Sequence, residues 1–258
     1  MISRGHPLVK RLRALRDDSA RRIEEGVFVA EGIHLAGEAL RSGASIETAL
    51  VAPGLRDDRL RSALVRRAER YEEAPDDLLG ALQDARAAQP VLLIVRREAI
   101  APRDGVPLVV VAVGIQDPGN LGTLFRSADA AGATELVACG GADPYHPRAV
   151  RATMGAIFRL PCSRAPFDRT AAALGSRGVP LVGAEAAGEV DYWAFDWTPP
   201  VAIVLGGEGS GLAPIPRDAL TSTVRIPMRE GIESLSVAAA GAVLLFEAAR
   251  VRRLTTGG

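Results

Sequence analysis

Hydrophobic residues in the first third of the chain fall into short runs separated by segments with helical spacing. Residues 27–29, 46–51 and 91–95 are largely apolar segments of strand length, and the pattern between them predicts helices over 31–42 and 57–70. Glycine, proline and aspartate between these segments are typical of turns and caps. Strands and helices are therefore expected to alternate.

A second alternation begins at residues 108–113, where apolar residues follow one another without a break. Such a run is typical of a parallel strand that is covered by helices on both faces. The remaining pattern predicts helices over 120–131, 147–158, 169–176 and 234–253, and strands over 135–138, 180–184, 201–205 and 223–226. The chain is therefore predicted to be an α/β protein with a parallel sheet in its second part.

A polar segment separates the two alternations and sets the expected domain boundaries. We expect one domain over residues 1–97, a linker over 98–106 and a second domain over 107–258. A chain of 258 residues, 48% of them hydrophobic, is long enough and apolar enough for two cores.

Composition narrows the class of protein. No stretch approaches the roughly 20 apolar residues that a membrane span needs, and the N-terminus lacks a signal-peptide core, so we expect a cytoplasmic protein with no membrane partner. The two cysteines, Cys139 and Cys162, lack metal-ligand spacing. We expect both to be buried thiols and expect no metal site.

The N-terminal segment is basic, although the chain as a whole carries no net charge. Residues 1–22 hold seven basic residues and two aspartates, a net charge of +5. This excess favours a surface that contacts phosphates; a solvated, arginine-rich helix is the alternative.

The candidate chemistry lies in loops at the ends of predicted strands. In the first loop, residues 114–120 lead into a helix that Asn120 is expected to cap, and Arg126 lies off the apolar stripe of that helix. A solvated surface arginine and a guanidinium aimed at a substrate both fit this position.

The second loop, residues 206–211, contains four glycines and one carboxylate, Glu208. Loops free of bulky side chains let a ligand lie against bare backbone. The spacing matches neither the phosphate loop nor the dinucleotide fingerprint. This disfavours a nicotinamide-dependent oxidoreductase on a doubly wound sheet.

The third loop, residues 226–236, leads into a long helix, and Ser234 or Ser236 is expected to cap it. Residues 237–246 are apolar on every side of that helix, which predicts burial on every side. The cover comes either from the rest of the chain or, in part, from a partner subunit.

In order and content, these loops resemble the SpoU (TrmH-like) family of RNA ribose 2′-O-methyltransferases, part of the knotted superfamily that uses S-adenosylmethionine. The family's first motif, Asn-x-Gly-x-x-x-Arg, occurs at residues 120–126, and its second, Leu-Gly-x-Glu-Gly-x-Gly, at 205–211. The third, Ile-Pro-Met and then Glu-Ser-Leu-Asn-Val, occurs at 226–228 and 233–237, with Ser236 in place of the asparagine.

Residues 7–10 and 26–32 also resemble the family's substrate-binding domain, so the resemblance covers nearly the whole chain. It implies an N-terminal domain with a ribosomal-protein L30e-like fold and a C-terminal domain with a deep trefoil knot that binds S-adenosylmethionine. It also implies a homodimer through the catalytic domain, with Arg126 near the cofactor of the partner subunit.

The resemblance also implies a set of site residues. Those implied for catalysis are Asn120, Arg126, Glu208, Ser234 and Ser236. Those implied for the cofactor are Ala184, Leu205, Gly206, Gly207, Ile226, Pro227, Met228 and Leu235. The expected RNA contacts are Arg4, Lys10, Arg11, Arg13, Arg126 and Arg148.

The implied activity is methyl transfer from S-adenosylmethionine to a ribose 2′-hydroxyl of structured RNA. A full N-terminal domain favours a large folded target, so 23S ribosomal RNA is preferred to transfer RNA. The alternatives are a tRNA 2′-O-methyltransferase and a non-catalytic RNA-binding or ribosome-assembly homologue whose site has decayed at Ser236.

Overall fold

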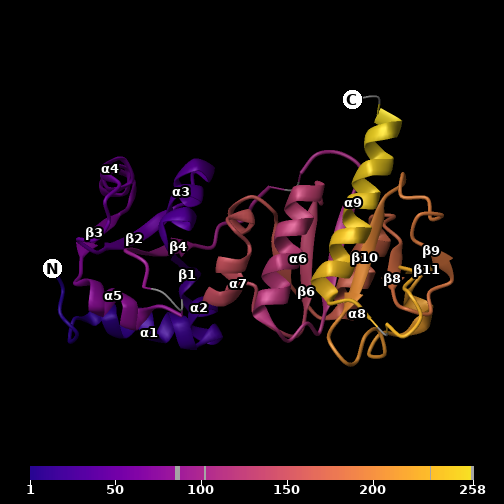
Figure 1. Cartoon of the computed structure of the whole chain (residues 1–258), viewed down its shortest axis with the longest axis horizontal. Helices are drawn as coiled ribbons and strands as arrows, with labels where there is room; N and C mark the ends of the chain where they lie inside the picture. Colours follow the sequence, from indigo (N-terminus) through magenta and orange to yellow (C-terminus); the bar gives the residue numbers. More distant parts are fainter. Residues whose placement is uncertain (85–87, 102, 233, 257–258) are drawn as a thin grey trace. The chain divides into compact units, whose positions relative to one another are not determined.

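The chain forms two compact units, each built around its own sheet (Figure 1). The computed structural model describes residues 1–84, 88–101, 103–232 and 234–256. The first unit comprises Met1–Ala99 and Tyr145–Arg159, and the second comprises Ile100–Pro144 and Leu160–Gly258. The Tyr145–Arg159 segment thus departs from the contiguous division expected from the sequence.

The first unit contains a mixed four-stranded sheet. In spatial order its strands are β1 (Val27–Glu31), β4 (Val91–Arg96), β2 (Ile46–Val51) and β3 (Arg70–Glu73). β4 is antiparallel to both β1 and β2, and β3 is parallel to β2. The strands expected at 27–29, 46–51 and 91–95 are confirmed, whereas β3, which has no buried residue, was not predicted.

Helices cover both faces of this sheet (Figure 1). On one side lie α1 (Pro7–Asp17), α2 (Ser19–Glu25) and α5 (Asp76–Leu82), and on the other α3 (Ile33–Ser42) and α4 (Asp58–Arg67). The arginine-rich N-terminal segment is not solvated on every side, because Leu8, Leu12 and Leu15 of α1 belong to the hydrophobic core.

The second unit contains a seven-stranded sheet in which every neighbouring pair is parallel. In spatial order its strands are β7 (Cys162–Arg164), β6 (Glu135–Cys139), β5 (Leu108–Val113), β10 (Val201–Gly206), β8 (Leu181–Ala184), β11 (Ser222–Arg225) and β9 (Val190–Asp191). The predicted parallel α/β fold is confirmed. The short edge strands β7 and β9 were not predicted, because neither contains an apolar run.

Helices also cover both faces of the second sheet. α6 (Pro118–Ala131) and α9 (Val237–Thr256) pack against each other on one face (Figure 1). α8 (Phe167–Ser176) packs on the other, where its Leu174 joins alternate valines of β5 in the core. Every residue of β5 is buried, as the unbroken apolar run predicts. The trefoil knot and the L30e-like assignment stay predictions.

The helix expected over 147–158 is broken in the structure. It consists of α7 (Pro147–Ala152) and a short 3-10 helix, η1 (Ala156–Phe158). Met154 and Gly155 between them have left-handed backbones, with φ of +50° and +92°. A Cβ on Gly155 would lie 2.4 Å from Cγ of Glu38, so the break lets the segment approach α3 closely.

α7 belongs to the first unit because it packs on β1 and is tied to it by polar and aromatic contacts. Arg151 donates to the buried carboxylate of Glu31 at 2.8 Å. The ring of Phe28 lies 5.2 Å from that of Tyr145 and 5.9 Å from that of Phe158. Local helical patterning contains no information about which sheet such a segment will cover.

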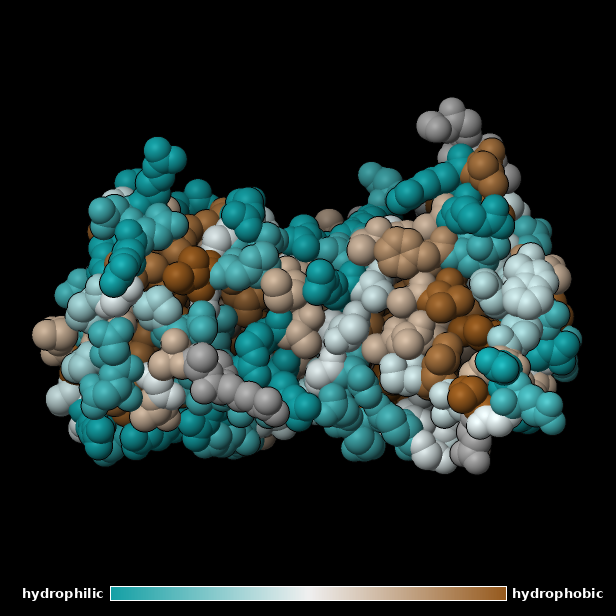
Figure 2. Space-filling view, viewed as in Figure 1, coloured by the Kyte–Doolittle hydropathy of each residue, from teal (hydrophilic) through white to brown (hydrophobic). Residues whose placement is uncertain are grey.

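α9 is not buried on every side by its own chain, so the rest of the chain does not supply all of the cover that the sequence predicts. Phe246 is 49% exposed, and Ala239 on the same face is also exposed. Figure 2 shows apolar side chains gathered over α9 on the surface of the second unit. No helix in the described part of the chain is long and apolar enough to cross a membrane.

Candidate active site

Two of the predicted loops meet at the carboxyl edge of the second sheet. β5 and β10 are parallel neighbours, and Gly206 pairs with Val113 at their ends. The two loops therefore emerge side by side, although they are far apart in sequence. Asn120 Nδ2 donates to Glu208 Oε1 at 2.7 Å, and the Gln116 amide donates to Glu208 Oε2 at 3.3 Å.

The sequence predicted that Asn120 caps α6, and the structure shows that it does not. The N-cap is Asp117, whose carboxylate accepts a hydrogen bond from the backbone N–H of Asn120 at 2.8 Å. Pro118 begins the helix. Asn120 therefore lies in the first turn. Because Asp117 caps the helix, the side-chain amide of Asn120 is available to donate a hydrogen bond to Glu208.

The glycine loop lies against the first loop more closely than any side chain would permit. A Cβ on Gly207 would lie 2.2 Å from the Gly114 carbonyl oxygen. Real Cβ atoms do not approach backbone oxygens that closely, so this position requires glycine. The glycines of the loop thus serve packing between loops as well as access for a ligand.

Glu208 is held in its ionised form. Burial raises its pKa, but hydrogen bonds from Asn120, from its own backbone and from the Gln116 amide outweigh that effect, and the pKa lies below the ordinary value. All of these partners are neutral. The loop therefore presents a full negative charge that no cation among its hydrogen-bond donors compensates.

A cavity of about 610 Å³ opens beside this carboxylate, at the carboxyl ends of β8, β10 and β11. Its volume is in the range of sites that hold a small ligand or cofactor. Residues expected at the cofactor or in catalysis that line it are Ala184, Leu205, Gly206, Gly207, Glu208, Ile226, Met228, Ser234, Leu235 and Ser236. Three discontinuous segments thus form one site.

Several lining residues were not predicted from the sequence. They are Glu185, Ala186, Gly209, Gly211, Leu212, Val224, Val237, Ala240 and Leu244. All of them except Glu185 are apolar or small. Glu185 differs, because it follows β8 outside any of the recognised motifs and brings a second carboxylate to the cavity.

Ser236 is the serine that caps α9. Its hydroxyl oxygen accepts the Ala239 amide at 3.2 Å, and its carbonyl oxygen accepts the Ala240 amide at 2.9 Å. The hydroxyl is therefore already used by the helix terminus. Ser234 is exposed and lines the cavity. Glu233, the first residue of the third motif's second part, lies outside the described residues.

Three of the residues expected in catalysis or at the cofactor do not line the cavity. Asn120 is one of them, and it contacts the lining through Glu208. Pro227 lies between two lining residues but is not itself one of them. Arg126 projects from α6, is exposed, and makes no hydrogen bond or ion pair with another described residue. Glu208 accepts hydrogen bonds from Asn120 and Gln116, not from Arg126 of the same chain.

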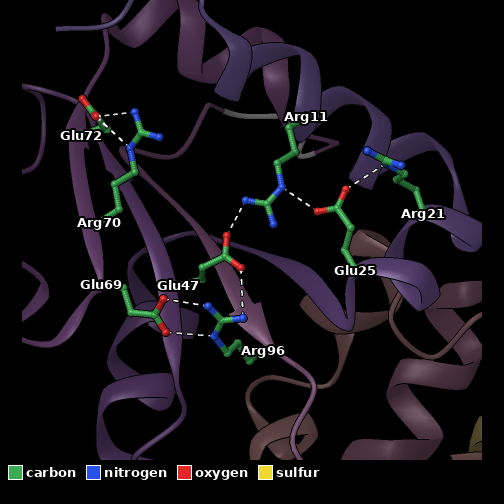
Figure 3. Close-up of polar contacts among 8 residues, drawn as sticks. All are labelled: Arg11, Arg21, Glu25, Glu47, Glu69, Arg70, Glu72 and Arg96. Carbon is green, nitrogen blue, oxygen red and sulfur yellow. Dashed lines mark hydrogen bonds and ion pairs between the residues drawn. The ribbon is translucent and has the colours of Figure 1, made fainter.

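The first unit contains a basic cleft of about 440 Å³, lined by Pro7, Leu8, Lys10, Arg11, Ala14, Arg21 and Arg70. Two of its arginines, Arg11 and Arg21, belong to a chain of ion pairs, whereas Arg70 pairs separately with Glu72 (Figure 3). Arg11 donates to Glu25 at 2.6 Å and also to Glu47. The hydrogen bond to Glu47 is the main reason that the pKa of Arg11 is raised.

The expected RNA contacts differ in how freely they are presented. Lys10 and Arg13 are exposed on α1, whereas Arg4 forms an ion pair with Asp77 at 3.1 Å. Arg148 on α7 is exposed. Arg22, which contributes to the N-terminal charge excess, is 2% exposed and donates to the Leu15 carbonyl at 2.6 Å. The charge available to phosphates is therefore smaller than the sequence suggests.

The cysteines are not equivalent. Cys139 is buried, and burial raises its pKa, whereas Cys162 is only half-buried, contrary to expectation. Among the residues that the structure describes, no group of three or more histidines, cysteines or carboxylates is placed to hold a metal ion.

Fold and site together define a parallel α/β domain that binds a small ligand against glycine-rich backbone at the carboxyl ends of its strands. Residues 107–246 match the SpoU rRNA Methylase family, and residues 6–92 match the MRM3-like substrate binding domain. The chain belongs to the SpoU rRNA Methylase family and is an RNA methyltransferase that depends on S-adenosylmethionine.

Similar proteins agree with this assignment. The chain is 33% identical over 254 residues to the 23S rRNA (uridine(2479)-2′-O)-methyltransferase of Streptomyces viridochromogenes, covering 93% of this chain and 88% of that protein. It is 36% identical over 151 residues to the 23S rRNA (guanosine-2′-O-)-methyltransferase RlmB of Ralstonia nicotianae, covering 58% of this chain and 61% of that protein.

Solved structures show the same similarity. The SpoU methyltransferase AviRb of Streptomyces viridochromogenes in complex with AdoMet is 30% identical, with a TM-score of 0.86 over 96% of this chain and 98% of that one. The AdoMet-bound rRNA methyltransferase of Sinorhizobium meliloti is 32% identical, with a TM-score of 0.83 over 97% of both chains.

Proposed function

We propose that this protein transfers a methyl group from S-adenosylmethionine to a ribose 2′-hydroxyl of 23S ribosomal RNA in the cytoplasm. The observation that carries the proposal is the cavity at the ends of β8, β10 and β11, whose rim holds the Asn120–Glu208 contact. The near full-length similarity to a 23S rRNA 2′-O-methyltransferase supports ribosomal RNA as the substrate.

The residues present fit the cofactor in size and in charge. The cavity of about 610 Å³ offers backbone from the glycine loop and apolar side chains such as Leu235, Val237 and Leu244. Ala184, Leu205, Gly206, Gly207, Ile226, Met228 and Leu235 would hold it. When bound, it supplies an electrophilic methyl group on a positively charged sulfur.

We assign Arg126 to the RNA rather than to the cofactor. A guanidinium stays protonated in proteins, so it is a poor base. It is suited instead to bind the phosphate beside the reacting ribose and to stabilise the alkoxide that forms there, while the proton passes to that phosphate or to water. Its exposure and its lack of a partner among the described residues leave it available for this role.

Asn120, Glu208 and Ser234 keep positioning roles in this proposal. Asn120 fixes Glu208 at 2.7 Å and so joins the first two loops. Ser234, exposed at the cavity, offers a hydroxyl to the acceptor nucleotide. Ser236 caps α9 through its hydroxyl, and a serine can do this as well as an asparagine. The departure from the family motif is therefore compatible with an active enzyme.

The proposal includes a homodimer formed through the second unit, in which Arg126 of one subunit acts beside the cofactor of the other. The exposed apolar face of α9, with Phe246 49% exposed, supports this arrangement. Burying such a face is favourable by roughly 25 cal/mol for each Å² of apolar surface removed from water. The dimer would also explain why Arg126 does not line the cavity of its own chain.

The proposal divides the work between a domain over residues 1–97 that binds RNA and a domain over 107–258 that binds the cofactor. The match of residues 6–92 to a substrate binding domain supports the first part. Lys10 and Arg13, exposed on α1, and the cleft arginines are suited to phosphate contacts. Arg4, Arg11 and Arg148 would first have to exchange or share partners with the RNA.

Mapping of 2′-O-methyl groups in RNA from cells with and without this protein tests the function. We expect one site in 23S rRNA to lose its methyl group in the deletion strain and to regain it when purified protein and S-adenosylmethionine are added. Loss of a methyl group from tRNA alone would assign the protein to tRNA. An unchanged methylation map, with assembly defects, would identify a non-catalytic homologue.

A further inference from the structure

The charged residues that line the cofactor cavity, among those the structure describes, are both carboxylates. Glu208 lies on the glycine loop at the end of β10, and Glu185 follows β8. The rest of the described lining is apolar, small or hydroxylic. A ligand in this cavity therefore experiences a negative potential, and the reaction changes the charge of that ligand.

The two carboxylates have different partners. Glu208 accepts hydrogen bonds from the neutral groups of Asn120 and Gln116, so its charge is not compensated by them. Glu185 accepts two hydrogen bonds from Arg217, at 2.5 and 2.8 Å. Arg217 does not line the cavity, and its side chain is 68% exposed, so this cation lies on the outer side of Glu185.

Methyl transfer breaks the bond from sulfur to carbon and leaves its electron pair on sulfur. A sulfonium, with one positive charge on sulfur, becomes a neutral thioether, while the rest of the cofactor keeps its charges. A fixed negative potential therefore binds the donor more tightly than the product, whereas contacts to the adenosine and amino-acid parts stabilise both equally.

We propose that Glu208 and Glu185 make this cavity selective for charge, so that it favours the sulfonium donor and releases the thioether product, with Arg217 moderating the effect of Glu185. The inference rests on the proposed methyl transfer, because that reaction produces the change in charge. It assigns Glu185 and Arg217, which lie outside the recognised motifs, a part in donor specificity.

The charge that each variant removes predicts whether the ratio of donor affinity to product affinity falls or rises. Glu208→Gln and Glu185→Gln each remove a negative charge and should lower the ratio of donor affinity to product affinity by up to about fivefold, the upper end of the range for solvent-facing charge pairs. Arg217→Gln removes a positive charge and should raise the same ratio. A loss of packing alone would weaken both ligands together.

Glu135 provides a matched control. It begins β6, so it lies at the opposite edge of the parallel sheet from the cavity, and it pairs with Arg177 at 2.5 Å. Its side chain is 23% exposed, against 20% for Glu185. Glu135→Gln makes the same change of charge in the same kind of ion pair and should leave the ratio unchanged.

The test is calorimetric titration of the full-length protein and the variants with S-adenosylmethionine and with S-adenosylhomocysteine, at low and at high salt. Circular dichroism and thermal unfolding confirm that each variant is folded, and Glu185→Gln keeps the test open if Glu208→Gln does not fold. Falling ratios for both glutamate variants and a rising ratio for Arg217→Gln, all diminished by salt, support the proposal.

Two results would overturn it: a wild-type ratio that persists in both glutamate variants, or a ratio that falls in Arg217→Gln as it does in Glu185→Gln. Failure of the proposed function has a different signature. In that case the wild-type protein either binds neither compound or binds both without methylating RNA, whatever the ratios in the variants.

Discussion

Removing Arg151 should destabilise the first unit while leaving the second intact. Arg151 on α7 is the cation that faces Glu31 on β1, a carboxylate whose side chain is 0% exposed. Glu31 accepts from Arg151 at 2.8 Å and from the Asp84 amide at 2.9 Å. The variant Arg151→Met keeps most of the side-chain volume, but among the described residues it leaves the buried carboxylate with only the Asp84 amide as a hydrogen-bond donor.

Breaking one side of a buried ion pair costs about 3–5 kcal/mol, because an uncompensated charge remains in the interior. The Arg151 side chain is 35% exposed, so solvent screens part of the interaction and we expect the free energy of unfolding to fall by about 2–3 kcal/mol. Arg159→Met is the matched control. Arg159 lies in the same segment as Arg151 and pairs with Glu38 of α3, but its side chain is 41% exposed. Its removal should lower the free energy of unfolding by about 1 kcal/mol or less.

The stability lost in Arg151→Met should also depend on pH. Burial raises the pKa of Glu31 more than the Asp84 amide and Arg151 lower it. The folded chain therefore holds the Glu31 proton more tightly than the unfolded chain, and stability from this site falls as pH rises from the ordinary carboxyl pKa through the raised one. Arg151→Met removes a cation and moves that window upward, so the loss should be greater at about pH 8 than at about pH 5.

Urea unfolding at both pH values measures these effects. Both tryptophans, Trp193 and Trp197, belong to the second unit, so their fluorescence follows that unit, while hydrogen exchange of β1 and α7 follows the first. An equal loss at both pH values, or a loss no larger than that of Arg159→Met, would refute the reasoning.

The remaining predictions concern the second unit. Arg126→Ala should abolish methyl transfer in a tritium assay but leave donor affinity unchanged in calorimetry; loss of both would contradict its assignment to RNA. Asn120→Ala should raise the pKa of Glu208 and lower the transfer rate, measured as a pH–rate profile; an unchanged profile would argue against the contact. Phe246→Asp should convert the dimer to monomers in sedimentation; a variant that stays dimeric would show that α9 is not the interface. Ser236→Asn should change stability by less than about 0.5 kcal/mol, because both residues cap helices well, and a large shift in melting temperature would disagree.

The sequence by itself determined most of the secondary structure and the order of the three motifs. The β5 run, buried along its whole length, was recognisable because parallel strands covered on both faces are apolar throughout. The glycine loop and its carboxylate were recognisable for a similar reason: a strand that ends in small residues leaves backbone accessible to a ligand. These are local properties, and they are written in adjacent residues.

Only the tertiary structure decided which residues meet. The Asn120–Glu208 contact joins positions 88 residues apart, and it exists because β5 and β10 are neighbours in the sheet. The partnership of Glu185 with Arg217, the burial of Arg22 and the association of α7 with β1 likewise depend on how elements pack. Local patterns of polarity fix which face of an element is apolar, but the free energy of packing, summed over distant segments, determines what covers that face.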